Sequence, residues 1–179
     1  MKNTLVVNFY AGPGTGKSTM MAHTFAELKW RGIDCEMATE YAKDKVWERS
    51  EHILQNQFYV SGQQYHRLRR LNGKVDVIVT DSPLLLGVYY GRDEPQEFQD
   101  LLVTHYHTFN NCNIFLGRVK EYKTNGRMQT EDQAKQIDTE IKGILAQNEV
   151  SFSVIPATKD HVQEVVDLIL ARIKSFPTI

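Results

Sequence analysis

The chain lacks several features that mark specialised classes of protein. It holds only two cysteines, Cys35 and Cys112, whose spacing matches no metal-ligand motif and which suit a reducing compartment. No apolar run approaches the length needed to span a membrane, and the N-terminus shows no charged-then-apolar signal layout. There is no internal repeat, low-complexity tract or linker. We therefore expect a cytoplasmic protein that has no membrane partner.

An excess of charge is missing as well. The 179 residues include 21 Lys and Arg against 22 Asp and Glu, so the net charge is −1 with neutral histidines. This balance gives no global argument for binding to nucleic acid or membrane, although it leaves room for a local basic patch. Apolar residues make up 41% of the chain, which is enough for one substantial core. We expect a single domain over residues 1–179.

The most informative stretch is residues 4–19, TLVVNFYAGPGTGKST. An apolar, β-prone run leads into a glycine-rich loop that ends in Gly16, Lys17 and Ser18, and helix-forming residues follow. This is the order that a phosphate-binding loop (P-loop) needs, because the N–H groups of the loop and of the helix end then face the anion. Ala11 replaces the first glycine of the G-x-x-x-x-G-K-S pattern and is small enough for the same turn. A glycine-rich turn that binds nothing is the disfavoured alternative.

This interpretation assigns roles within the loop. Its backbone would hold the phosphates of ATP, Lys17 would reach the β- and γ-phosphates, and the Ser18 hydroxyl would bind Mg²⁺. The predicted nucleotide-binding residues of this stretch are Ala11, Gly12, Pro13, Gly14, Thr15, Gly16, Lys17, Ser18 and Thr19.

Apolar runs alternate with helical patterns along the remaining chain. Further strands are predicted over residues 33–38, 75–81, 112–117 and 151–155, and helices over residues 16–31, 98–109, 130–147 and 160–174. Thr130 and Gln133 form a capping-box pattern at the start of one helix. Five strands that alternate with helices predict a parallel sheet covered on both faces, an α/β fold of the three-layer P-loop NTPase type.

Two carboxylates follow predicted strands, at the edge where open α/β sheets bind ligands. Asp81 ends the run VDVIVTD, and a carboxylate at that strand tip can hold Mg²⁺ together with Ser18, whereas a capping role is less favoured. Glu40 follows the strand predicted over residues 33–38. Position alone supports two interpretations of Glu40 equally. Its side chain could lie near the transferred phosphate, or it could be a solvated charge at the end of a strand.

Two polar segments are candidates for substrate contacts. Residues 41–71 are helical in tendency and rich in Gln, Tyr, His and Arg. Glutamines and aromatics of this kind could read a base or a sugar, although an ordinary amphipathic helical hairpin is somewhat favoured. Residues 118–130 are basic, and Arg118 and Arg127 would neutralise charge on a transferring phosphate if this segment forms a lid. A solvated loop is the alternative interpretation of the second segment.

Missing motifs also separate the classes of P-loop protein. Motor and unfoldase ATPases usually carry Glu after the strand-end Asp to activate water, but Ser82 stands there. The chain has no N-K-x-D guanine-reading motif and is short for the helical lid domain of such machines. Transfer of phosphate to an acceptor other than water is therefore favoured, while a non-kinase ATPase switch or assembly module stays open.

In these motifs the chain resembles the P-loop nucleoside and nucleotide kinase group, and most of all small phage-type AAA-like kinases that are similar to ribosylnicotinamide kinases. The matching motifs, in chain order, are AGPGTGKS, TEYAKD, VIVTDSP, YKTNGRMQT and VIPATKD. The resemblance covers almost the whole chain in layout. It implies a phosphotransferase dependent on ATP and Mg²⁺ that acts on a hydroxyl of a nucleoside, a nucleotide or a related acceptor, in the host cytoplasm if the chain is phage-encoded.

The resemblance also implies roles for single residues. Glu40 matches the carboxylate that contacts the acceptor hydroxyl as general base, and Asp81 matches the metal-associated carboxylate. Arg118 and Arg127 match lid arginines. The positions that match the adenine contacts of the group, after its fifth strand, are Ala157 and Thr158.

The acceptor itself stays open. A kinase that acts on a hydroxymethylated base within phage DNA is an alternative to one that acts on a free nucleoside, since the basic stretch over residues 67–74 could contact DNA phosphates. Nothing in the sequence indicates an oligomeric state.

Overall fold

The computed structural model describes residues 2–119 and 130–175, and residues 1, 120–129 and 176–179 are not described. The elements in chain order are β1 (Leu5–Tyr10), α1 (Lys17–Trp30), β2 (Cys35–Ala38), α2 (Tyr41–Trp47), the 3₁₀ helix η1 (Glu51–Gln55), α3 (Gln57–Arg69), β3 (Val77–Thr80), α4 (Leu86–Tyr90), α5 (Gln96–Tyr106), β4 (Asn110–Gly117), α6 (Glu131–Gln147), β5 (Ser153–Pro156), the 3₁₀ helix η2 (Lys159–His161) and α7 (Val162–Lys174). In the described part of the chain, no helix is both long and apolar enough to cross a lipid bilayer.

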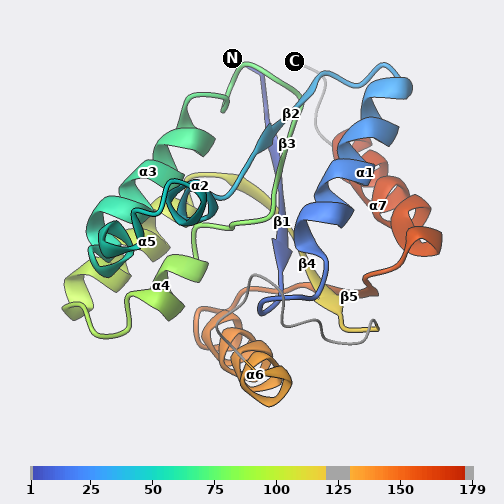
Figure 1. The fold of residues 1–179 in the computed structure, drawn as a ribbon. Coiled ribbons are helices and arrows are strands. Elements are labelled where there is room, and N and C mark those ends of the chain that lie inside the picture. Colours follow the sequence, from blue (N-terminus) through green and yellow to red (C-terminus); the bar gives the residue numbers. More distant parts are fainter. Residues whose placement is uncertain (1, 120–129, 176–179) are drawn as a thin grey trace.

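The sheet has five parallel strands in the order β2-β3-β1-β4-β5. Helices α1 and α7 cover one face, and α3, α4, α5 and α6 pack on the other (Figure 1). Strands covered on both faces are mostly apolar rather than alternating, as the fully buried runs LVVNFY of β1 and VIVT of β3 are, with Asn8 and Thr80 as their polar members. The predicted three-layer α/β fold with a five-stranded parallel sheet is therefore confirmed.

Asparagine side chains form a polar contact inside this sheet. Asn8 of β1 donates its side-chain N–H groups to the amide oxygens of Asn111 and Asn113 of β4, at 2.9 and 3.1 Å. The Tyr106 hydroxyl donates to the Asn113 oxygen at 3.0 Å. Because these amides satisfy one another, polar residues can lie within the ladder, and β4 begins at Asn110 rather than at the predicted residue 112.

The segment over residues 41–71 divides into α2, η1 and α3. Helix α2 ends before Arg49, whose φ of 55° breaks the helix. Helix α3 begins after Asn56, whose side chain accepts the backbone N–H of Tyr59 at 3.0 Å and so caps the helix. The predicted helical tendency is confirmed, but the segment is three short helices rather than one hairpin of two.

The capping box predicted for α6 is present. The Thr130 side chain accepts the Gln133 backbone N–H at 3.2 Å, and the Gln133 side chain accepts the Thr130 backbone N–H at 2.8 Å. These two contacts satisfy N–H groups that a helix end otherwise leaves without partners.

We predict that Thr130→Ala lowers the free energy of unfolding by about 1 kcal/mol, the usual cost of losing such a cap. Thr139→Ala is the matched control, because Thr139 is exposed on the same helix and its hydroxyl only bonds back to the Lys135 carbonyl. The control should change stability by less than about 0.5 kcal/mol. Urea unfolding followed by circular dichroism measures both, and equal effects of the two variants would contradict the capping role.

Candidate functional site

The site lies at the edge of the sheet formed by the carboxyl ends of the strands. Strand β1 is paired with β3 on one side and β4 on the other, so the connections from the central strands leave in opposite directions at this edge. Open α/β sheets bind ligands in the crevice that such a divergence creates. The loop after β1 and the start of α1 lie at this end of the molecule, with α6 beside them (Figure 1).

The loop after β1 has the backbone geometry of an anion-binding loop. Gly14 and Gly16 take left-handed φ values of 81° and 109°, which residues with a Cβ adopt only with strain. Gly16 caps α1 without any side-chain hydrogen bond, so the N–H groups of the first turn are open to a ligand. The Thr15 hydroxyl donates to the Gly12 carbonyl at 3.1 Å and braces the turn.

Lys17 lies across the mouth of this loop. Its ammonium group donates to the carbonyls of Ala11 and Gly12, at 2.7 and 3.2 Å. Desolvation lowers the pKa of Lys17, while the negative charges of Glu40 and Asp81 act in the opposite direction. The structure thus brings together the three side chains that the sequence had predicted from three different strand ends.

Ser18 and Asp81 form a pair of oxygen ligands beside Lys17. The Ser18 hydroxyl donates to one carboxylate oxygen of Asp81 at 2.5 Å. Asp81 is 2% exposed, and its other oxygen is buried and has no hydrogen-bond partner among the described residues. A hydroxyl and an unpaired carboxylate oxygen next to a phosphate-binding loop are the hard ligands that Mg²⁺ takes, so these residues fit the ion.

Glu40 is the N-cap residue of α2, two positions after the end of β2, and is half-buried. Burial raises the pKa of its carboxyl group, the Lys17 charge opposes this rise, and the Asp81 charge adds to it. Desolvation and then the charge of Glu40 raise the pKa of Tyr90, so this phenol at the end of α4 lies within the electrostatic reach of Glu40. No sequence pattern pointed to Tyr90, which approaches Glu40 only through packing of α4.

The polar face of α3 supports the Glu40 segment. Arg67 donates to the Thr39 carbonyl and hydroxyl, at 3.1 and 2.8 Å, and forms an ion pair with Asp44. Gln64 accepts the backbone N–H of Tyr41 at 3.0 Å. Arg67, and Gln64 as one of the glutamines considered for reading a base or sugar, therefore hold the backbone on either side of Glu40.

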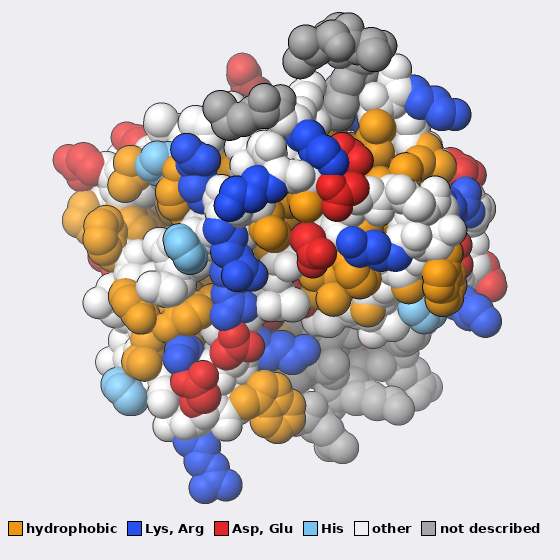
Figure 2. Space-filling model, turned by 90° about the horizontal axis from the view of Figure 1, so that it is seen from above, with side chains coloured by type: hydrophobic (Ala, Val, Ile, Leu, Met, Phe, Trp, Pro, Cys, Tyr) orange, Lys and Arg blue, Asp and Glu red, His pale blue; other side chains and the backbone are white. Residues whose placement is uncertain are grey.

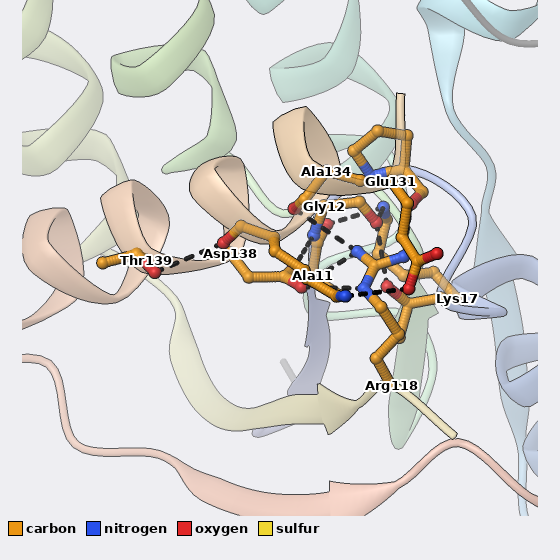
Figure 3. A network of polar contacts seen from close by, with 11 residues as sticks. Ala11, Gly12, Lys17, Arg118, Glu131, Ala134, Asp138 and Thr139 are labelled. Carbon is orange, nitrogen blue, oxygen red and sulfur yellow. Dashed lines mark hydrogen bonds and ion pairs between the residues drawn. The ribbon is translucent and has the colours of Figure 1, made fainter. Parts of the chain in front are cut away.

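Arg118 lies at the end of β4, close to the phosphate-binding loop. It donates to the Asp138 carboxylate of α6 through Nε at 3.0 Å and Nη2 at 2.9 Å, and to the Pro13 carbonyl through Nη1 at 2.9 Å (Figure 3). Asp138 was missed by the sequence reasoning, because only the packing of α6 places it at the loop. The second expected lid arginine, Arg127, lies outside the described residues.

A small pocket lies on the other side of α1's first turn. Ala157 and Thr158, the positions expected to contact adenine, both line it. The other lining residues are Gly16, Thr19, Met20, His23, Lys159 and Val162. His23 is a further candidate contact that sequence reasoning missed, although it stands six positions after Lys17 on the same helix.

The fold, the loop and the Ser18–Asp81 pair define a P-loop nucleotide-binding domain. A family model described as an AAA domain matches residues 6–164, and the chain belongs to that family. Comparison with curated proteins gives no match.

The fold is shared with solved structures. The crystal structure of NadR protein in complex with NR matches with a TM-score of 0.69 and 16% identity, over 99% of this chain and 54% of that chain. The chain thus spans about half the length of the NadR structure. The family match confirms the predicted AAA-like P-loop domain, and this likeness confirms the predicted resemblance at the level of the fold.

We predict that Asp81→Asn raises the Mg²⁺ concentration needed for tight binding of a non-hydrolysable ATP analogue by about tenfold, since it removes one charge-assisted ligand. Asp76→Asn is the control, because Asp76 precedes the same strand at its other end and pairs with Lys2. A fluorescent analogue titrated with MgCl₂ measures both. An unchanged Mg²⁺ midpoint in Asp81→Asn would remove Asp81 from the metal site.

Proposed function

We propose that the chain is an ATP- and Mg²⁺-dependent phosphotransferase that moves the γ-phosphate to a hydroxyl of a nucleoside, a nucleotide or a related acceptor. The observation that carries this proposal is the position of Glu40. A half-buried carboxylate of raised pKa lies within the field of Lys17 and Asp81, at the edge of the phosphate-binding loop. Such a group suits a general base that removes a proton from an acceptor hydroxyl.

The residues present support an in-line transfer. Backbone N–H groups of the loop and the Lys17 ammonium would bind the donor phosphates, and Ser18 and Asp81 would hold Mg²⁺, which neutralises charge on the β- and γ-phosphates. Glu40 would orient the acceptor hydroxyl and accept its proton. The acceptor oxygen then forms a bond to the γ-phosphorus as the bond to the β-phosphate oxygen breaks, and ADP leaves.

Three further assignments belong to this proposal. Ala157 and Thr158 would contact the adenine in the pocket beside α1. Arg127 would stabilise charge on the transferring group as a lid arginine. Ser82, which follows Asp81 where water-activating ATPases carry Glu, favours an acceptor other than water.

A hydroxymethylated base in DNA is a less supported acceptor. Arg69, Arg70 and Lys74 are exposed and take part in no ion pair among the described residues. The Lys2 N–H donates to the Gly73 carbonyl at 3.1 Å, so this patch lies at the end where β1 begins. Figure 2, seen from the end where the N-terminus lies, shows a line of Lys and Arg on this face. A DNA strand would have to span about 20 Å, the length of β1, to reach the phosphate-binding loop.

Transfer from γ-labelled ATP tests the proposal directly. The panel of acceptors contains nucleosides, nucleoside monophosphates, nicotinamide riboside, and DNA with hydroxymethylated pyrimidines. We expect label on a small nucleoside-type acceptor and none in Lys17→Ala, because the loop then lacks its cation. Label released only as free phosphate, at a rate that no acceptor changes, would instead support an ATPase switch, and label on DNA with a steep salt dependence would support the DNA acceptor.

The raised pKa of Glu40 predicts a pH profile. The base must be ionised, so kcat/KM is retained at high pH and falls as the pH drops through a pKa above the ordinary value of 4.5. In Glu40→Gln the fall of kcat/KM at low pH should disappear, and kcat should be lower by about 100-fold or more while ATP still binds. Glu36→Gln, at an exposed position of β2, should behave as wild type. A full transfer rate in Glu40→Gln would exclude the general-base role.

A further inference from the structure

A closed set of contacts joins α6, the end of β4 and the phosphate-binding loop. One carboxylate oxygen of Asp138 accepts the backbone N–H of Gly12, and the other accepts two N–H groups of Arg118. Arg118 in turn donates to the Pro13 carbonyl at 2.9 Å. In Figure 3 the Asp138 side chain points from α6 to Gly12, and the Arg118 guanidinium fills the space beside the loop. Two successive loop residues are thus held from outside the loop.

This contact is shielded from solvent. The side chains of Arg118 and Asp138 are 12% and 14% exposed, so salt and water screen their attraction only weakly. Removing one partner of such a pair leaves the other charge enclosed and uncompensated. Loss of either member should therefore be costly. The pair of Arg92 with Glu140 of α6 differs, because its side chains are 60% and 38% exposed.

The phosphate-binding loop packs closely against α6 at Gly12. A Cβ added at Gly12 would lie 2.7 Å from the Ala134 carbonyl and 2.9 Å from an Asp138 oxygen. Gly12 has no positive φ, so glycine is needed here for the close approach of α6 and not for the turn itself. The backbone of α6 thus lies directly against the second residue of the loop.

The peptide unit between Ala11 and Gly12 connects Asp138 to Lys17. Its N–H, on Gly12, is held by Asp138, while its carbonyl, on Ala11, accepts from the Lys17 ammonium at 2.7 Å. The next carbonyl, on Gly12, accepts from Lys17 at 3.2 Å and from Thr15 at 3.1 Å. A rotation of this peptide would therefore move the acceptor that sets the position of Lys17. Arg118 uses Nε, Nη1 and Nη2 on protein acceptors, including Ala134 at 3.5 Å, which leaves little of its donor capacity for a phosphate.

We propose that Asp138 is a positioning residue of the nucleotide site, which together with Arg118 holds the Gly12–Pro13 backbone, and with it Lys17, in the geometry that binds the donor phosphates. This proposal rests on the proposed function and deepens it. It gives Arg118 the role of holding the loop in shape, so that other groups stabilise the charge on the transferring phosphate. Asp138 acts through Gly12 and Arg118 and does not itself touch the substrate.

Asp138→Asn is the main test. It keeps the shape and one oxygen for the Gly12 N–H, but it removes the charge and turns an N–H group toward Arg118. We expect the dissociation constant of a non-hydrolysable ATP analogue to rise by roughly tenfold to 100-fold, as when a binding group is misplaced by about 1 Å. In transfer assays KM for ATP should rise while KM for the acceptor stays unchanged. Glu140→Gln, in the exposed pair of the same helix, is the control and should bind the analogue as wild type does.

A double-mutant cycle separates the two possible roles of Arg118. If Arg118 and Asp138 act as one unit, Arg118→Met and Asp138→Asn should each weaken analogue binding, and the double variant should be no weaker than the worse single variant. A large loss of kcat in Arg118→Met with unchanged analogue affinity would instead show direct contact with the transferring phosphate and overturn the proposal. Folded Asp138→Asn with wild-type affinity would overturn it as well.

The binding measurement keeps this proposal distinct from the proposed function. If no acceptor is phosphorylated but Asp138→Asn still weakens analogue binding, the kinase assignment fails and the positioning role stands. If transfer occurs normally in Asp138→Asn, the positioning role fails and the kinase assignment stands. Thermal unfolding of each variant identifies any that do not fold, and Asp138→Glu, which keeps the charge at a shifted distance, replaces a variant that is unfolded.

Discussion

The position of the Lys17 ammonium group is the constraint on which the rest of the site depends. A partly enclosed cation needs nearby negative charge or carbonyl oxygens, and the described structure supplies both. Glu40 and Asp81 come from the ends of β2 and β3, which lie beside β1 on one side of it. The strand order therefore gathers Glu40, Asp81 and Lys17 at one edge of the sheet, and the roles proposed for them as base, metal ligand and phosphate contact depend on this topology.

Local pattern was sufficient to predict much of this arrangement. The strand, the glycine-rich loop and the helix are contiguous in sequence, so the loop could be assigned with its Ala11 variation. Asp81 could be predicted because it directly follows an apolar strand, and parallel strands end at a common edge. For Glu40, position alone left a site residue and a solvated charge equally supported, and the resemblance favoured the site. The capping box at Thr130 is likewise a signal contained within four residues.

Contacts that depend on packing could not be predicted. Asp138 and Gly12 are separated by 126 positions, and no local pattern marks a helix residue that will face a loop. Tyr90 approaches Glu40 only because α4 packs beside that edge. On α3, the glutamines were left open between reading a ligand and an ordinary amphipathic helix. Gln64 accepts the buried backbone N–H of Tyr41, which needs a partner, and Arg67 donates to the Thr39 carbonyl.

The amide contact between Asn8, Asn111 and Asn113 has a consequence for the opposite end of the same strands. A shift of β4 by one residue along β1 would turn these amides to the wrong face and leave polar groups without partners in an apolar interior. The same shift would displace Arg118 by about 3.3 Å relative to Pro13. The three asparagines thus help to fix the register of β4 against β1. The position of Arg118 at the phosphate-binding loop therefore depends partly on side chains that lie away from that loop.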